Sequence, residues 1–186
     1  MTFPKVYRND HAINEKRFDI ENNTLTLIAT QQPMASDLRV LSSIIEVITE
    51  LERIGDYAKG VARINFLIGH ETLIIPIGDL LMMAELASDM MLKGIKAFVE
   101  QHEDLARSLP SEDDKVDELY NQFNKGLVAR MVEDNSLIKQ ANLIQWAFHN
   151  IERMADRVTN ICERTIFVVT GEMNEYESLD KVLFLQ

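Results

Sequence analysis

The feature that most constrains this chain is a Glu-Arg-x-x-Asp motif that occurs twice. The first copy runs from Glu52 to Asp56 and the second from Glu152 to Asp156, 100 positions later. Residues four apart lie on one face of a helix, so each copy places two carboxylates one turn apart. Like charges at this spacing repel by about 0.2–0.5 kcal/mol. A chain that repeats the arrangement is expected to hold something cationic beside it.

The repeat extends to the apolar residues around each motif. On a helical wheel of about 100° per residue, the two sets occupy the same angles, and the motif carboxylates lie on their flank. The alternative is a solvated flank with ordinary salt bridges, and two copies at one angle argue against it. The first stripe is Ile44, Val47, Ile48, Leu51, Gly55, Ala58 and Ala62, and the second is Ile144, Ala147, Phe148, Ile151, Ala155, Val158 and Cys162.

Helical periodicity covers most of the chain, and no convincing strand pattern occurs. The breaks between helices fall at prolines or at short polar turns, and Gly171 is a plausible C-cap for the last helix. The predicted fold class is therefore all-α. We expect helices over residues 4–30, 33–68, 77–107, 111–134 and 136–169.

The charge balance excludes some function classes. The formal net charge is −11 and the sequence pI is about 4.8, whereas a nucleic-acid-binding protein needs a basic surface. The single cysteine, Cys162, reads as a core residue and fits a reducing compartment. Residues 1–20 lack an apolar signal core, and no apolar run reaches the roughly 18 residues of a membrane span. We expect a cytoplasmic setting and no nucleic-acid partner.

A second acidic pair lies upstream of each motif. Asp113 and Asp117 precede the later copy, and Asp10 and Asn14 hold the matching places before the earlier one. Antiparallel helices of the intervening length could bring each pair opposite its motif. The sequence therefore predicts two oxygen-rich sites, and such ligands suit hard or borderline cations.

The two predicted sites differ in their ligand sets. Asn160 lies one turn beyond Asp156 and completes the later site, whereas Gly60 takes that place in the earlier one. His149 is either an additional ligand, a hydrogen-bond partner of one, or an ordinary polar flank residue. Each motif arginine follows its glutamate directly, so Arg53 and Arg153 are expected to point away from the site and to form salt bridges on the outer flank.

Three segments of the sequence together resemble the PhoU family of phosphate-signalling proteins. The segment 32–39 contains Pro-x-Ala-x-Asp-Leu-Arg, and segments 51–56 and 152–161 carry the paired motifs. The resemblance implies two three-helix bundles with multinuclear iron or zinc at the paired acidic residues. It also implies a negative regulator of the phosphate-starvation response, commonly dimeric. Family members act between the phosphate ABC transporter, including its ATPase, and a sensor histidine kinase, at the inner membrane face without spanning it.

The resemblance divides the chain into a first repeat, 1–74, a second repeat, 75–178, and a tail, 179–186. A helix of about thirty residues precedes Asp113, but only nine residues precede Asp10. We therefore expect the first repeat to consist of two helices, through a trimmed or mis-started chain. Two helices alone expose an apolar face, which predicts self-association through residues 4–68 or a helix borrowed from a partner.

The rival class is an enzyme. Ferritin-like di-iron proteins need Glu-x-x-His pairs on facing helices, and no glutamate here has a histidine three residues on. A metal-dependent phosphatase is conceivable because a multinuclear site can generate hydroxide, yet no basic group is evident to hold a phosphoryl group. A third reading is a metal-free helical interaction scaffold. We interpret the chain as a non-enzymatic regulator.

Overall fold

The computed structural model describes residues 3–173, and this part of the chain is helical and contains no strand, which confirms the all-α prediction. The end of the predicted second repeat and the tail 179–186 lie outside the described residues. No helix in the described region is long and apolar enough to cross a membrane. In chain order the elements are α1 (Phe3–Gln31), α2 (Ser36–Ile68), α3 (Gly78–Glu100), α4 (Glu103–Ser108), α5 (Pro110–Glu133), the 3₁₀ helix η1 (Asn135–Leu137) and α6 (Ile138–Thr170).

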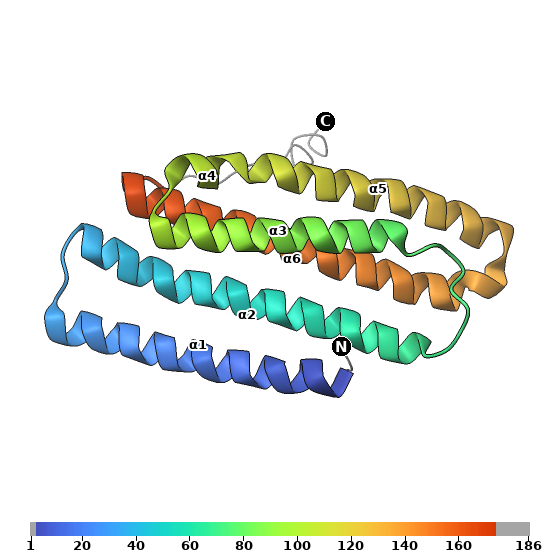
Figure 1. The fold of residues 1–186 in the computed structure, drawn as a ribbon, viewed down its shortest axis with the longest axis horizontal. Coiled ribbons are helices and arrows are strands. Elements are labelled where there is room, and N and C mark those ends of the chain that lie inside the picture. The colour runs from blue at the N-terminus through green and yellow to red at the C-terminus, as the bar shows by residue number, and fades with distance from the viewer. Residues whose placement is uncertain (1–2, 174–186) are drawn as a thin grey trace.

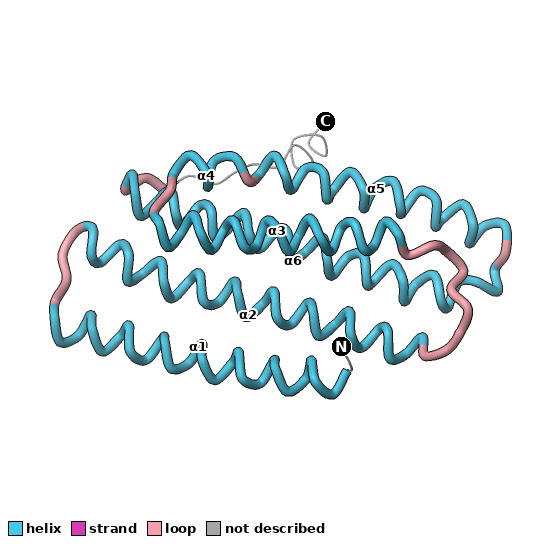
Figure 2. Tube along the Cα trace, viewed as in Figure 1, coloured by secondary structure: helices cyan, strands magenta, loops and turns pink. Residues whose placement is uncertain are grey.

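The long helices lie side by side along the longest axis of the molecule (Figure 1). α1 forms one edge and packs on α2, which packs in turn on α6. α6 also contacts α3, α4 and α5, so it lies at the centre of the fold. The loops gather at the two ends of the bundle (Figure 2). Away from the two ends, side chains of neighbouring helices therefore face one another directly, without intervening loops.

The sequence of α6 matches its central place. All seven residues of the predicted second stripe are buried, and Phe148 at its centre is stacked on Phe123 of α5 with ring centroids 3.4 Å apart. Cys162 is fully buried, as predicted. The helix ends where expected, because Gly171 adopts a left-handed conformation with φ of 79° and closes it.

The predicted first stripe on α2 is only partly right. Val47 and Ile48 are buried, but the other five residues of the stripe are half-buried: Ile44, Leu51, Gly55, Ala58 and Ala62. The physical reason is that α2 lies between two helices and therefore has two contact faces. A Cβ on Gly55 would lie 3.3 Å from Cδ1 of Ile13, so this part of the stripe faces α1 rather than the central core. The other buried residues of α2 are Ser43, Glu50, Ile54 and Ile64.

The predicted helix over 77–107 is wrong at its end. α3 stops at Glu100, and Gln101 turns the chain with a left-handed φ of 51° and ψ of 43°. His102 then caps α4, because its Nδ1 accepts a hydrogen bond from the backbone N–H of Leu105 at 3.2 Å. Neither residue is a strong helix breaker, so periodicity alone gave no sign of the turn. The following helix begins at Pro110, a residue favoured in the first helical turn.

The 100-residue repeat appears in the structure as an approximate two-fold relation between α2 and α6. The helices run antiparallel, since Glu46 pairs with Arg164 at 2.8 Å and Glu50 accepts from Asn160 at 3.1 Å. The two-fold relation predicts that the repeat equivalents of Glu50 and Asn160, which are Asn150 and Gly60, also lie close together. They do, because a Cβ on Gly60 would lie 3.0 Å from Asn150 Nδ2. α1 and α2 thus correspond to α5 and α6.

Two glycines within helices differ in the space around them, and the comparison shows how closely α3 packs on α6. A Cβ on Gly94 of α3 would lie 2.8 Å from Cγ1 of the buried Val158, whereas one on Gly126 of α5 meets nothing within 4 Å. Gly94→Ala should therefore destabilise the fold by about 1–3 kcal/mol through overpacking. Gly126→Ala should stabilise it by about 0.4–1 kcal/mol. Denaturant titration of both variants checks this, and equal effects would contradict the close approach.

Candidate metal centre

The second repeat gathers four of its predicted ligands between α5 and α6. Asp113 on α5 is only 7% exposed, and its Oδ1 has no hydrogen-bond partner among the described residues. Burial, followed by the negative charges of Asp117, Asp156 and Glu152, raises the pKa of Asp113 to about 8. A carboxyl group with this environment lacks a compensating cation.

Glu152 on α6 is in a similar position. Burial, and then the charges of Asp156 and Asp117, raise its pKa to about 7. Its Oε2 lies 3.3 Å from Nδ1 of His149 without hydrogen-bond geometry. Burial and the charge of Arg153 lower the pKa of that imidazole, so His149 does not supply a positive charge at neutral pH. The predicted extra ligand therefore lies beside the cluster as a neutral nitrogen donor.

Asp156 is the member of the cluster with a strong partner. Nη1 of Arg153 donates to its Oδ2, and Nη2 of Arg157 lies 3.9 Å from the same oxygen. The expectation that Arg53 and Arg153 form salt bridges is therefore confirmed, but Arg153 does not point away from the site, because its partner is a predicted ligand. The Arg153 side chain is long enough to reach Asp156, three residues further along α6. It partly offsets the charge at this end of the cluster.

Asn160, the fifth predicted ligand of the second site, is engaged elsewhere. Its Nδ2 donates to Oε2 of Glu50 at 3.1 Å, across the interface between α2 and α6. Glu50 also meets Arg157 at 3.3 Å and Arg53 at 2.7 Å. Glu50 was not predicted as a site residue, although its spacing from Val47 and Ile54 places it on a buried face.

In the first repeat a lysine lies between the predicted ligands. Lys59 Nζ donates to Asp10 Oδ2 at 2.7 Å and to Asp56 Oδ1 at 2.6 Å, and so joins α1 to α2. Burial opposes the charge, but the bonds to both carboxylates outweigh it and raise the pKa of Lys59. Asn14 and Glu52, the other two predicted ligands, are half-buried on the same two helices. Lys59 was missed, although it follows Asp56 by three residues on the motif face.

The two repeats therefore differ in how well they fit a metal ion. Within residues 3–173, no three imidazole, thiol or carboxylate groups converge on one metal position as the side chains lie here. Asp113, Asp117, Glu152 and Asp156 nonetheless form a carboxylate set. Among the described residues, neither Asp113 nor Glu152 forms an ion pair with a lysine or arginine, and the charges of Arg153 and Arg157 offset the burial of Glu152 only in part. This chemistry suits iron or zinc. The first-repeat residues do not fit, because an ammonium group already lies between Asp10 and Asp56.

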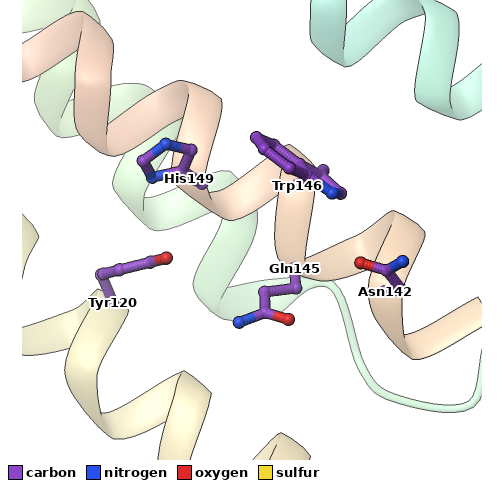
Figure 3. Close-up of a pocket in the computed structure, with 5 residues that line it drawn as sticks. All are labelled: Tyr120, Asn142, Gln145, Trp146 and His149. Atoms are coloured by element: carbon purple, nitrogen blue, oxygen red, sulfur yellow. The ribbon is translucent and has the colours of Figure 1, made fainter. Parts of the chain in front are cut away.

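A surface pocket of about 290 Å³ opens beside the α5–α6 carboxylates. Its lining comes from Tyr120 on α5 and from Asn142, Gln145, Trp146 and His149 on α6 (Figure 3). The His149 ring contacts Trp146 edge-on at 5.5 Å and Tyr120 at 6.1 Å between centroids. Trp146, the only tryptophan of the chain, thus contacts His149, whose Nδ1 lies 3.3 Å from Glu152, and it can report on events at the cluster.

The fold and the site define a helical-repeat protein in which facing helices of each repeat carry acidic side chains. The family model described as PhoU domain matches residues 2–64 and 80–165. The chain belongs to the PhoU family.

Similar proteins support this assignment over most of the chain. The chain is 36% identical to the phosphate-specific transport system accessory protein PhoU homolog 1 of Methanothermobacter thermautotrophicus, over 90% of this chain and 77% of that protein. The crystal structure of PhoU from Pseudomonas aeruginosa superimposes with a TM-score of 0.87 at 32% identity, covering 91% of this chain and 82% of that one. The phosphate transport system regulatory protein PhoU from Streptococcus pneumoniae gives 0.86 at 28% identity, covering 94% and 82%.

The raised pKa values of Asp113 and Glu152 predict how metal-free protein responds to pH. Both groups keep a proton in the folded state at a pH where the unfolded chain has lost it, so stability falls as pH rises from about 4 towards 8. Each such group contributes at most about 1.4 kcal/mol per pH unit in this window. In the presence of a chelator, urea unfolding should show lower stability at pH 8 than at pH 5.

Asp113→Asn should flatten that pH dependence, because the neutral amide has no proton to lose. Glu85→Gln, at an exposed position on α3, is the matched control and should leave the slope unchanged. A slope that is the same in Asp113→Asn as in the parent protein would contradict the uncompensated carboxyl group.

Proposed function

We propose that this protein is an accessory and regulatory component of a phosphate-specific transport system. In this role it restrains phosphate uptake and the phosphate-starvation response, and links the ATPase of the phosphate ABC transporter to a sensor histidine kinase at the inner face of the membrane. The observation that carries the proposal is the family match over 2–64 and 80–165, together with relatives named as accessory or regulatory proteins of phosphate transport.

The surroundings of the carboxylates favour a non-enzymatic role over a metal-dependent phosphatase. Such an enzyme needs cationic groups that are available to hold the substrate phosphoryl group. The arginines nearest the cluster, Arg153 and Arg157, already pair with Asp156 and Glu50. A phosphate bound there would have to compete with these carboxylates.

The second part of the proposal is that iron or zinc binds between α5 and α6. Asp113, Asp117, Glu152 and Asp156 would hold it, with His149 as a neighbouring donor. A cation there would remove the repulsion among the four carboxylates and link the two helices. The chemistry it supplies is charge neutralisation and cross-linking, and the resulting rigid bundle would present the surfaces that meet the transporter and the kinase.

Elemental analysis of protein purified without a tag or chelator tests the metal. We expect more than one iron or zinc per chain, lost in Glu152→Ala/Asp156→Ala because half of the carboxylate set is removed. The control is Asp79→Ala/Glu85→Ala, which removes two exposed carboxylates from α3. Metal titration should also change the fluorescence of Trp146. Parent protein that is metal-free and as stable as the double variant would contradict metal binding.

The same two variants test the regulatory role. In cells that lack their own PhoU protein, the parent protein should repress a phosphate-starvation reporter. The control variant should repress it equally. Loss of repression in Glu152→Ala/Asp156→Ala connects the acidic site to regulation. Full derepression with the parent protein, at normal abundance and in the presence of the matching transporter and kinase, would contradict the role.

The exposed face of the first repeat supports a homo-oligomer. Val116 and Phe123 of α5 belong to the central core or pack on it, and Val116 is 0% exposed. Ile13 and Ile20 hold the corresponding places on α1, yet they are 39% and 41% exposed. Phe18, Leu25 and Leu27 add to the exposed apolar surface of the same helix. Apolar surface of this extent in one element is typical of an interaction surface.

Sedimentation equilibrium should therefore show more than one chain per particle at micromolar concentrations. Ile20→Glu should weaken the association at least tenfold, because a charge would be buried in the interface. Val132→Glu, at a 77% exposed position on α5, should leave it unchanged. A monomeric parent protein whose α1 stays ordered would overturn this part of the proposal.

A further inference from the structure

We propose that Lys59 closes the acidic site of the first repeat, so that this chain takes metal between α5 and α6 and not between α1 and α2. The asymmetry between the repeats deepens the metal binding proposed above. The closed state of the first site is nevertheless argued from its own contacts and can be tested without the second site.

The ammonium group of Lys59 lies between the two helices of the first repeat. Lys59 Nζ lies 2.7 Å from Asp10 Oδ2 and 2.6 Å from Asp56 Oδ1. Asp10 is on α1 and Asp56 on α2, so the group lies between the same two carboxylates that a metal would have to join. Zinc binds carboxylate oxygens at about 2.0–2.2 Å, and a metal in this place would have to expel Nζ.

The lysine side chain is held in this place. Its side chain is 29% exposed and that of Asp10 is 12% exposed, so water screens the contact with α1 only in part. Two of the three ammonium donors are used by carboxylates from different helices. Removing the lysine from this place would leave Asp10 and Asp56 facing each other without a counter-ion, unless another cation took its place.

The second repeat differs at the corresponding position. The residue 100 positions after Lys59 is Thr159, whose hydroxyl donates to the backbone carbonyl of Asp156 at 2.8 Å and carries no charge. The residue matching Asp117 is Asn14, so the first site has one carboxylate fewer as well as one ammonium more. These two differences act in the same direction, because both reduce the attraction for a cation.

The functional consequence is a division of labour between the repeats. Lys59 links α1 to α2 whether or not metal is present, and its charge cannot be removed by a chelator. A change in metal supply would then alter the link between α5 and α6 alone. The chain would respond to metal at one side of the bundle and remain constant at the other.

The test measures zinc in a background where the second site is disabled by Asp113→Asn/Glu152→Gln. Lys59→Thr places the second-repeat residue in the first site, and Lys59→Met removes the charge with less effect on side-chain length. Both should gain about one zinc per chain, and zinc should raise their melting temperature. Lys59→Arg, which keeps the charge, should stay zinc-free. Circular dichroism establishes that each variant is folded.

The location of the new zinc is tested by adding Asp56→Asn to Lys59→Thr, which should abolish the gain. The proposal is overturned if Lys59→Thr and Lys59→Met bind no more zinc than the background. It is also overturned if the background itself holds zinc that Asp56→Asn removes, because the site would then be open with Lys59 present. Absence of zinc from the parent protein would count against the α5–α6 site, and would leave these outcomes unaffected.

Discussion

Two repeat-related helices, α2 and α6, lie antiparallel, and each of the other helices packs against one of them. Their interface is not purely apolar: Glu50 of α2 meets Arg157 and Asn160 of α6. Burying a charged carboxylate is costly unless charged or amide donors satisfy it, so these contacts favour one alignment of the two helices. The alignment in turn places α1 against α2 and α5 against α6, with their acidic side chains facing across.

The negative charge of the same motif is therefore offset in two different ways in one chain. In the first repeat the counter-ion is Lys59 of the chain itself. In the second repeat Arg153 pairs with Asp156, and its charge, with that of Arg157, offsets only part of the cost of burying Glu152. Asp113 has no ion-pair partner among the described residues. This difference explains why ligand sets that look alike in sequence are not equivalent in space. The second repeat is the place where an external cation would change the energetics of the fold.

The sequence predicted the fold class, the centre of α6 and the pairing of Asp113 with the second motif, because helical periodicity and repeat spacing are local properties. It did not predict the two contact faces of α2, because the angular distribution of apolar residues around a helix does not give the number of helices that pack on it. The turn at Gln101 was also missed, because the residue carries no strong conformational preference and tertiary packing decides its backbone. Lys59 was not predicted because the Glu-Arg-x-x-Asp pattern ends at Asp56 and does not include the lysine three residues later. Asn160 was predicted as a ligand because it lies one helical turn beyond Asp156, whereas its amide donates to Glu50 of the neighbouring helix.

α1 packs on α2 at the edge of the bundle, and the lysine bridge to Asp10 joins the two helices. Proteins open in cooperative units, and the unit with the fewest buried contacts opens at the lowest free energy. Few residues of α1 are buried, whereas α6 is buried along most of its length. The amide protons of α1 should therefore exchange with solvent through a partial opening that leaves the four helices α3 to α6 folded. The chain can thus exchange or rearrange its first helix without passing through the unfolded state.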